Sequence, residues 1–397
     1  MSLAGRRVVL GVSGGIACYK ACTVARRLTD AGAAVDVILT ASAAEFVRGP
    51  TFEGLTGRPV LQSLWDPGRA LDHIHFAREA DIVVVAPATA NLIARAAQGI
   101  ADDFLTAMLL ARTRAVLLAP AMNDRMFAND ATRQNLETLG QRGWSVVGPA
   151  IGPLAEGPSE APGRMAEPDE IVVHVERLLG RTRSPLNGKK VVVTAGPTRE
   201  PLDPVRVLTN RSSGRMGYAL AEAAFARGAD VVLISGPTSL TPPIGATLIR
   251  VNSTEELCSA VAGHLAAAQV LIMAAAPADF RVSQPAATKQ PRKDGPRSVE
   301  LQPTVDVLEA TLARRPRKIA CIGFALETGG DVGRAREKLR AKRLDLIVLN
   351  DATEAAAGFE VETNRVTLIT ANDAIPLPLM SKRQVAEQIL DRVEAIT

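Results

Sequence analysis

A glycine-rich segment near the start of the chain has the composition of a phosphate-binding loop. The sequence GVSGGI occupies residues 11–16, between an apolar run at residues 8–12 and a segment of helical periodicity at about residues 16–31. Glycines allow the backbone to approach a phosphate, and the N–H groups at the start of the next helix are free to bind it. The spacing differs from GxGxxG, which argues against a standard dinucleotide site, and a tight strand–helix turn would also use glycine.

Polar residues follow two later apolar runs of this half. One run ends in APATAN at residues 86–91, and the other ends in PAMNDRM at residues 120–126. Ligands of open α/β sheets gather at the carboxyl ends of strands, so Asn123 is placed to hold a carboxylate or an amide, or to form an Asx turn. The pair His73 and His75 has the spacing of metal ligands, but no third ligand is evident, and a buried structural histidine is the commoner outcome.

The second half has a comparable set of polar strand ends. TAGPT follows one apolar run at residues 194–198, and NRSSGRMG opens a helix at residues 210–217. Two serines, two glycines and an asparagine exceed what a helix cap requires and favour an anion-binding cradle. Asp279 follows a further run, where an acid suits a ribose or a metal-linked contact. Lys338 and Lys342 share one helix face, where they can bind phosphates together or simply face solvent.

Alternating strands and helices are needed to position these segments. Short β-branched runs alternate with helical patterns in both halves, which predicts parallel strands buried on both faces of a doubly wound sheet. The predicted fold class is therefore α/β, with two Rossmann-like domains. Further helices are expected near Thr89, at residues 169–179 and at residues 382–396. The expected strands are residues 8–12, 35–39, 82–86, 115–119, 189–194, 231–235, 270–274, 319–324, 346–349 and 366–369.

Segments rich in glycine and proline divide the chain. Residues 149–167 are too long and irregular for a tight connection, and such loops are often functional lids. The sequence GRTRSPLNG ends the first half, so we expect domains at residues 1–180 and 189–397 with a linker at residues 181–188. Residues 282–297 are polar and basic, which predicts a mobile basic loop.

The composition is that of a globular protein. Of the 397 residues, 47% are apolar and 22% are charged, and the net charge of +4 arises from basic residues scattered among acids. Aromatic residues make up only 3%, so stacked-base recognition of nucleic acid is not expected. No apolar stretch is long enough for a membrane span, and no signal peptide begins the sequence. Four cysteines without a CxxC pair indicate a reducing compartment, so we expect a cytoplasmic protein without disulfides.

The motifs of the first half resemble those of the flavoprotein family of FMN-dependent cysteine decarboxylases. The matching patterns are GVSGGIA, HIxF, APATANL, ADDFLT and PAMNxxMF, over nearly all of residues 5–178. The resemblance implies a flavodoxin-like domain in which FMN oxidises a substrate thiol, the adjacent carboxylate leaves as CO2, and the electrons then return.

The same resemblance implies particular residue roles. His73 is the catalytic base, Asn123 holds the substrate carboxylate, and Met126 contacts substrate. Arg78 reaches substrate across a trimer interface. The residues implied to line FMN are Ser13, Gly14, Gly15, Ile16, Thr40, Thr89, Ala90, Asn91 and Ala121.

The lid of the first half departs from this family. Members usually carry ACGxxGxGRM, in which the Cys donates a proton in the final reduction. Residues 155–165 read AEGPSEAPGRM instead, one residue longer and without the Cys, and Cys18 and Cys22 are expected on the helix after the phosphate loop. Alternatively, the first half is slow or stops at the oxidised enethiol. The candidate proton donors are Glu156, Ser159, Glu160 and a water molecule.

The second half resembles phosphopantothenate–cysteine ligases from about residue 187 to 394. The motifs are TAGPTREPLDPVR, NRSSGRMG, GFALET and PLMSKRQVAEQIL, and the domain order matches the family of bifunctional coenzyme A biosynthesis proteins. The resemblance implies that CTP, with Mg2+ on its triphosphate, activates the carboxylate of 4′-phosphopantothenate as an acyl-cytidylate, which the amine of cysteine then attacks.

Residue roles follow from this resemblance as well. Asn210 handles the acyl-cytidylate, Lys289 assists the later chemistry, and Ser212 and Gly214 contact substrate. The implied CTP site comprises Ala274, Ala275, Asp279, Lys289, Val305, Asp306, Val307, Leu308, Phe324, Lys338 and Lys342.

The ligase motifs also contain departures. Lys289 corresponds to the first Lys of a family KxKK loop, whose second and third Lys are Pro291 and Arg292 here. AAPADF replaces AAVADF, and VDVL at residues 305–308 replaces PDIL. The first Lys is retained, so we expect ligase activity, and these changes bear on nucleotide preference.

Three functions are therefore compared. The leading one is a bifunctional enzyme that makes 4′-phosphopantetheine from 4′-phosphopantothenate, cysteine and CTP. The second is an active ligase with a slow or degenerate FMN-binding first domain. The third is a flavin-binding regulator that inhibits a phosphatase by binding it, which the fused ligase and the retained His73 and Asn123 disfavour. The resemblance implies a homo-oligomer built from decarboxylase trimers and ligase dimers.

Overall fold

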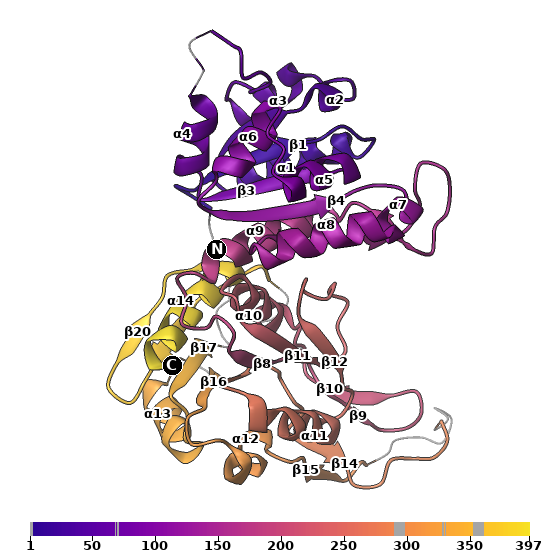
Figure 1. Cartoon of the computed structure of the whole chain (residues 1–397). Helices are drawn as coiled ribbons and strands as arrows, with labels where there is room; N and C mark the ends of the chain where they lie inside the picture. Colours follow the sequence, from indigo (N-terminus) through magenta and orange to yellow (C-terminus); the bar gives the residue numbers. More distant parts are fainter. Residues whose placement is uncertain are drawn as a thin grey trace. The chain divides into compact units, whose positions relative to one another are not determined.

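The computed structural model divides the chain into two compact units, Met1–Leu179 and Gly180–Thr397 (Figure 1). It describes residues 3–67, 69, 71–289, 298–327, 329, 331–351 and 361–397. Each unit contains a mainly parallel sheet with helices on both faces. The predicted α/β class with two doubly wound domains is confirmed.

The sheet of the first unit has five parallel strands in the order β2-β1-β3-β4-β5. This is the flavodoxin-like order, in which the direction of winding reverses between β1 and β3. The strands are β1 (Arg7–Val12), β2 (Ala34–Leu39), β3 (Ile82–Ala88), β4 (Ala115–Pro120) and β5 (Ser145–Val146).

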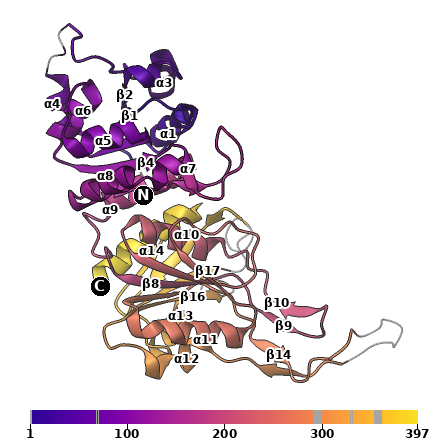
Figure 2. The same ribbon diagram turned by 45° about the vertical axis from the view of Figure 1, so that its right-hand side comes forward.

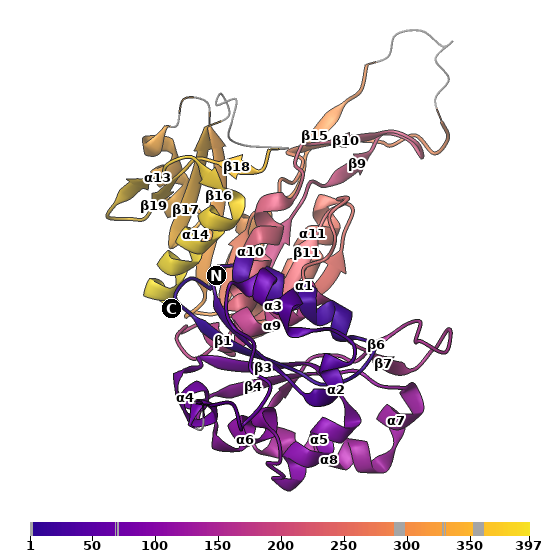
Figure 3. The same ribbon diagram turned by 90° about the horizontal axis from the view of Figure 1, so that it is seen from above.

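Helices cover both faces of this sheet (Figure 3). Successive strand residues point to opposite faces, so Val8 and Leu10 pack with α1 and α9, whereas Val9 packs with α5 and α6. A hairpin of β6 (Ala150–Ile151) and β7 (Pro162–Arg164) lies within the expected lid segment. The helices are α1 (Cys18–Asp30), α2 (Ala41–Ala44), α3 (Gly49–Thr56), α4 (Asp72–Glu79), α5 (Ala90–Gln98), α6 (Phe104–Ala111), α7 (Asp124–Ala128), α8 (Asp130–Gln141) and α9 (Pro168–Gly180).

The second unit has an eight-stranded sheet in the order β12-β11-β8-β13-β16-β17-β19-β20. Its first six strands are parallel and follow the Rossmann order, so the winding reverses between β8 and β13. Strand β19 pairs antiparallel with β17, and β20 pairs antiparallel with β19. The strands are β8 (Lys190–Ala195), β11 (Asp230–Ser235), β12 (Thr247–Arg250), β13 (Val270–Met273), β16 (Ala320–Glu327), β17 (Leu346–Asp351), β19 (Val366–Ile369) and β20 (Ala374–Pro376).

Helices also cover both faces of the second sheet. The core on one face includes residues of α11, α12 and α13, whereas α10 and α14 pack together on the other. Gly217 lets α10 lie against β8, because a Cβ there would be 2.5 Å from the Cβ of Ala195. The helices are α10 (Arg215–Ala226), α11 (Thr254–His264), α12 (Val307–Ala310), α13 (Val332–Ala341) and α14 (Lys382–Ile396), with 3-10 turns at Leu265–Ala267 and Leu312–Arg314.

Two antiparallel hairpins and one further strand pair accompany this sheet. The hairpins β9–β10 and β14–β15 project from it (Figure 2), and β18 pairs antiparallel with the non-consecutive strand β21. Their bounds are β9 (Arg199–Pro201), β10 (Val207–Thr209), β14 (Phe280–Val282), β15 (Leu301–Pro303), β18 (Thr363–Asn364) and β21 (Met380–Ser381).

The segment at residues 181–188, expected as a linker, packs into the second unit. The Oγ of Ser184 donates a hydrogen bond to Oε1 of Glu394 at 2.5 Å, and the side chain of Leu186 is fully buried. Among the described residues, every helix is too short or too polar to cross a membrane.

Arg227 follows α10 and joins it to α14. Its side chain is 3% exposed, and its guanidinium donates to Oε2 of Glu387 at 2.5 Å and to Oδ1 of Asp391 at 2.6 Å. Arg227 and Glu387 are largely withdrawn from water, whereas Asp391 is exposed, so loss of the cation would remove the charge that compensates the buried Glu387 carboxylate.

We expect Arg227→Met to lower the free energy of unfolding of the second unit by roughly 3–5 kcal/mol, the usual cost of removing one partner of a buried ion pair. Urea unfolding measures the loss, and hydrogen exchange of the backbone amides of α10 and α14 locates it. The matched control is Arg392→Met on α14, whose pair with Asp373 is exposed; its effect should stay below about 1 kcal/mol. Equal effects for the two variants would contradict the prediction.

Candidate functional sites

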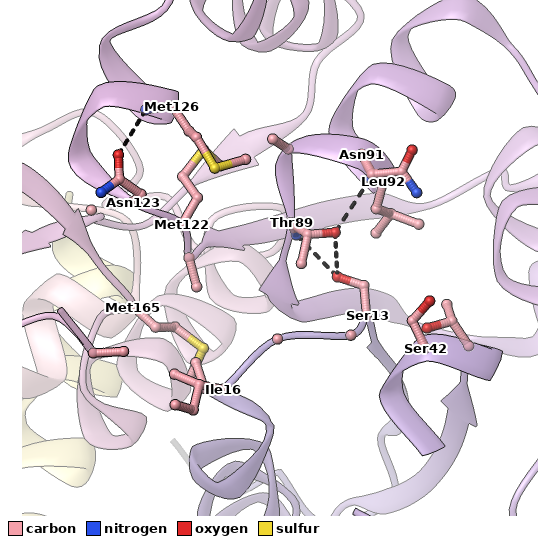
Figure 4. Close-up of a pocket in the computed structure, with 18 of the residues that line it drawn as sticks. Ser13, Ile16, Ser42, Thr89, Asn91, Leu92, Met122, Asn123, Met126 and Met165 are labelled. Atoms are coloured by element: carbon pink, nitrogen blue, oxygen red, sulfur yellow. Dashed lines mark hydrogen bonds between the residues drawn. The ribbon is translucent and has the colours of Figure 1, made fainter. Parts of the chain in front are cut away.

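The first unit contains a cavity of about 940 Å³ at the carboxyl edge of its sheet (Figure 4). Loops that follow β1 to β4 form its walls, because parallel strands end at the same edge. Its volume is in the range of cofactor sites. The residues expected to line FMN all border this cavity, namely Ser13, Gly14, Gly15, Ile16, Thr40, Thr89, Ala90, Asn91 and Ala121.

Ser13 joins the loops after β1 and β3. Its Oγ donates to the carbonyl oxygen of Pro87 at 2.8 Å and accepts from the backbone N–H of Thr89 at 3.0 Å (Figure 4). Thr89 in turn caps α5 by accepting from the N–H of Leu92. The two loops on either side of the winding reversal are thereby fixed to each other.

Gly14 allows the loop after β1 to approach the start of α2. A Cβ at Gly14 would lie 2.3 Å from the Cβ and 2.6 Å from the carbonyl carbon of Ser42, so a side chain is excluded there. The N-cap of α1 is Ala17, which offers no side-chain hydrogen bond to the first turn. This close, uncapped strand–helix junction is suited to a phosphate.

Asn123 caps α7 at the opposite wall. Its Oδ1 accepts from the N–H groups of Arg125 at 2.8 Å and Met126 at 3.3 Å. Its Nδ2 therefore faces away from the helix, and it donates to Oε1 of Glu156 in the lid. Asn123, Met126 and Glu156 all line the cavity. Asn123 therefore forms the Asx turn that was one of the alternatives, and its amide nitrogen is also a hydrogen-bond donor that faces the cavity.

The structure does not bring His73 or Arg78 into the cavity of their own chain. His73 lies on α4 with its ring edge against Phe104, 6.4 Å between centroids, and Phe104 follows the cavity residue Asp103. Nδ1 of His73 is buried without a hydrogen-bond partner among the described residues, and Arg78 is exposed. The described residues also contain no cluster of three potential metal ligands around His73 and His75.

The second unit contains a cavity of about 810 Å³, also at the carboxyl edge of its sheet. It lies where the winding reverses between β8 and β13. All but one of the residues expected for substrate and nucleotide border it: Asn210, Ser212, Gly214, Ala274, Ala275, Asp279, Val305, Asp306, Val307, Leu308, Phe324, Lys338 and Lys342.

Two threonines and an asparagine connect the strand ends at this reversal. Thr194 Oγ1 accepts from the N–H of Ala275 at 3.1 Å, and Thr198 Oγ1 accepts from the N–H of Ala278 at 2.8 Å. Asn210 donates from Nδ2 to the carbonyl oxygen of Pro277 at 2.9 Å. The cradle at residues 210–217 is therefore held against the loop after β13.

Lys338 of α13 and Lys342, which follows the helix as its C-cap, line the cavity, and each is paired with an acid. Nζ of Lys342 lies 2.6 Å from Oδ2 of Asp306, and Lys338 donates to Glu327. Partial burial alone would raise the pKa of Asp306, but the hydrogen bond from Lys342 and backbone N–H groups lower it below its usual value. Both lysines line the cavity, where their side chains are partly exposed and paired with acids.

Lys382 lines the same cavity and was not singled out from the sequence. Lys382 begins α14 and is 6% exposed. Its burial, and to a smaller extent the nearby positive charge of Arg215, lowers the pKa of its side chain. Asn364 is 1% exposed, and Oδ1 of Asn350 has no hydrogen-bond partner among the described residues. These three polar residues form one wall. In the sequence, the only signal was the position of Lys382 inside the terminal motif.

Lys289 is the exception among the predicted nucleotide residues. It is exposed, lies in the segment after β14, and does not line the cavity. Pro291 and Arg292, which replace two lysines of the family loop, lie outside the described residues.

Comparisons with known proteins cover both units. The family model "Flavoprotein" matches residues 1–180, and the model "DNA/pantothenate metabolism flavoprotein C-terminal domain" matches residues 186–396. Among relatives named "Coenzyme A biosynthesis bifunctional protein CoaBC", that of Mycobacterium tuberculosis H37Rv is 47% identical over 98% of this chain and 96% of its own. That of Vibrio cholerae is 44% identical over 98% of both chains, and that of Bacillus subtilis is 45% identical over 100% and 98%.

The solved structures that we compared each match one of the two units of this chain. The C-terminal domain of a CoaBC protein is 40% identical and covers 53% of this chain and 96% of its own, with a TM-score of 0.46. A mutant PPC decarboxylase, in complex with pantothenoylaminoethenethiol, is 31% identical over 43% of this chain and 96% of its own, with a TM-score of 0.39. The family prediction made from the motifs is confirmed by the full-length relatives and the two family models. The chain belongs to the family of bifunctional coenzyme A biosynthesis proteins, CoaBC.

Proposed function

We propose that this chain makes 4′-phosphopantetheine from 4′-phosphopantothenate, cysteine and CTP in the cytoplasm. The second unit ligates the acid to cysteine, and the first unit decarboxylates the product with FMN. One observation carries the proposal: each unit has a cavity at the winding reversal of its sheet, lined by the residue types that its reaction needs.

The first cavity suits FMN. The junction of Gly14, Gly15 and α1 would hold the phosphate, while Thr89, Asn91 and Ala121 would flank the remainder of the cofactor. When bound, FMN would supply the two-electron oxidation of the substrate thiol and the later return of these electrons. Asn123 would hold the substrate carboxylate through its cavity-facing Nδ2.

His73 and Arg78 would complete the first site of a neighbouring copy. Both lie on α4, outside the cavity of their own chain. Apolar residues before α4 are unusually exposed, with Trp65 at 89% and Leu71 at 63%. Contact with another copy would cover them, as in the trimeric arrangement that the motifs imply.

The second cavity would bind CTP through Lys338 of α13 and Lys342 at the C-cap of this helix. Lys338 and Lys342 would exchange their present partners Glu327 and Asp306 for the triphosphate and its Mg2+. A carboxylate oxygen of 4′-phosphopantothenate would attack the α-phosphorus of CTP, with loss of pyrophosphate. The amine of cysteine would then attack the acyl carbon, with loss of CMP. Lys289, which does not line the cavity, would assist the later chemistry.

The phosphate end of 4′-phosphopantothenate would bind at the start of α10. Ser212 and Gly214 line the cavity there, and the helix N-terminus favours an anion. Lys382 lies at the same place, close enough to Arg215 for their charges to repel. Arg215 itself pairs with Glu362 and does not line the cavity. A phosphate beside Lys382 would favour the charged form of this lysine, so we add Lys382 to the substrate site.

The ligase unit would dimerise through its projecting hairpins. β9–β10 and β14–β15 lie next to each other and expose several apolar side chains. A second copy would cover these residues, which are Val205, Val207, Leu208, Phe280 and Leu301.

The full reaction tests the proposal directly. We expect the purified protein, supplied with 4′-phosphopantothenate, cysteine, CTP and Mg2+, to yield 4′-phosphopantetheine, CMP and pyrophosphate by mass spectrometry. Accumulation of 4′-phosphopantothenoylcysteine or of its oxidised, decarboxylated form would support the proposed ligase activity together with the alternative of a slow first unit. Absence of every conjugate would contradict the proposed function.

We expect Gly14→Ala to remove most bound flavin, because the added methyl group collides with the backbone of Ser42. Flavin absorbance per protein measures the loss, and 4′-phosphopantothenoylcysteine should still form, since the ligase lies in the other unit. The matched control is Gly140→Ala in α8, where a Cβ meets no atom within 4 Å. Normal flavin content in the Gly14 variant would refute the assigned phosphate loop.

We expect Lys382→Met to weaken binding of 4′-phosphopantothenate by roughly 10- to 150-fold, the loss of one charge-assisted hydrogen bond. Affinity for unphosphorylated pantothenate should change little, so the preference for the phosphorylated acid falls. Isothermal titration measures both. Lys318→Met, at an exposed lysine of the same unit, is the control. An equal loss for both acids would show that Lys382 only supports the fold.

A further inference from the structure

The lid of the first unit places one acidic side chain in the flavin cavity. Leu154 and Gly157 exchange two backbone hydrogen bonds, of 2.8 and 3.1 Å, which form a tight turn with Ala155 and Glu156 at its tip. Leu154, Ala155 and Glu156 all line the cavity. The sequence places Glu156 after Ala and before Gly, where the family pattern ACG has its proton-donating Cys.

The orientation of the Asn123 amide, which contacts Glu156, is fixed by hydrogen bonds to α7. Because Oδ1 of Asn123 accepts two N–H groups of α7, its Nδ2 must point into the cavity, where it donates to Oε1 of Glu156. Under the proposed function, the same Nδ2 holds the substrate carboxylate. Glu156 therefore lies beside the carbon atom that carries this carboxylate.

The other candidate donors are turned elsewhere. Ser159 donates from Oγ to Oδ2 of Asp124 at 2.5 Å, and this hydrogen bond lowers the pKa of Asp124. Neither Ser159 nor Glu160 lines the cavity. Cys18 donates to the carbonyl oxygen of Ser13 at 3.3 Å and is fully buried in α1, and Cys22 lies one turn later, outside the cavity lining.

We propose that Glu156 is the acid of the decarboxylase reaction, an inference that rests on the proposed function. Loss of CO2 leaves the electron pair of the broken C–C bond in an enethiolate. The carboxyl group of Glu156 gives its proton to the former α-carbon, which converts the enethiolate to a thioaldehyde. When bound in its reduced form, FMN would supply the hydride that completes the reduction of this thioaldehyde to the product thiolate. Solvent then protonates the product thiolate, and Glu156 stays ionised until the next substrate binds.

Substrate binding itself supplies the proton on Glu156. The substrate carboxylate and Glu156 both approach Nδ2 of Asn123, and two carboxylates so close cannot both stay ionised without a large repulsion. Binding is therefore expected to take up one proton from solvent, held by Glu156. When CO2 departs, the second negative charge leaves with it, and the proton becomes available at the adjacent carbon.

The first test separates the proton transfer from the earlier steps. In Glu156→Gln, the amide still accepts a hydrogen bond from Asn123, so the lid keeps its contact but loses its acid. With 4′-phosphopantothenoylcysteine under anaerobic conditions, we expect CO2 release in the first turnover, a flavin that stays reduced, and a product lighter than 4′-phosphopantetheine by H2. Formation of 4′-phosphopantetheine should slow by at least about 100-fold.

Matched variants sharpen this test. Glu160→Gln, in the same lid but outside the cavity, should form 4′-phosphopantetheine as the unmodified protein does. Glu156→Cys should restore the final reduction, because it recreates the thiol of the family pattern. Normal formation of 4′-phosphopantetheine by Glu156→Gln would overturn the proposal, as would failure of this variant to release CO2. An unmodified protein that forms no decarboxylated product would instead refute the proposed decarboxylase.

The second test needs no turnover. S-Methyl-4′-phosphopantothenoylcysteine carries the carboxylate but has no thiol to oxidise. Titration calorimetry of the flavin-loaded protein, in buffers of different ionisation enthalpy, should show uptake of about one proton on binding of this compound near neutral pH. Glu160→Gln should behave in the same way, whereas Glu156→Gln should take up almost none. Equal proton uptake by the Glu156 variant and the unmodified protein would overturn the proposal.

Discussion

The reversal of winding beside the first strand of each sheet is the constraint on which both sites depend. At this point two neighbouring strands send their chains to opposite faces, so the loops separate and leave a crevice. Hydroxyl groups hold the crevice at a fixed width. Ser13 bonds the loop after β3 in the first unit, and Thr194 and Thr198 bond the loop after β13 in the second. In both units, short hydroxyl side chains thus connect the two loops at the winding reversal, although the two cavities are lined by different residues.

Much of this architecture is predictable from the sequence. The strand at residues 366–369 and the helix at residues 382–396 have the predicted bounds, because buried apolar periodicity is a local signal. The strand β12 was missed, since its four residues are half-exposed and lack an apolar run. The cradle at residues 210–217 was predicted because its composition exceeds the needs of a helix cap, whereas the glycines of residues 11–16 also fitted a tight turn.

The remaining features of the two sites were not predictable from the sequence, because they depend on contacts between segments that are distant in the chain. Lys382 and Asn364 reach one cavity wall from a helix start and a two-residue strand, and no local spacing relates them. Likewise, no sequence pattern indicates that His73 packs on Phe104, away from the cavity residues of its own chain. The lid was recognisable as a departure from a family pattern, but only the contact with Asn123 distinguishes Glu156 from Ser159 and Glu160.

If the ligase cavity binds a nucleotide as proposed, its ion pairs would also affect which anions can compete for it. Asp306 is the counter-ion of Lys342, and Glu327 is shared between Lys338 and Arg334, so the acids offset part of the positive charge of these lysines. A small, weakly charged anion such as chloride cannot replace both carboxylates and gains little from either lysine alone. A triphosphate can engage both lysines simultaneously and bring its own metal ion to the displaced acids. Under the proposed function, the resting cavity would therefore favour a triphosphate over a small monovalent anion.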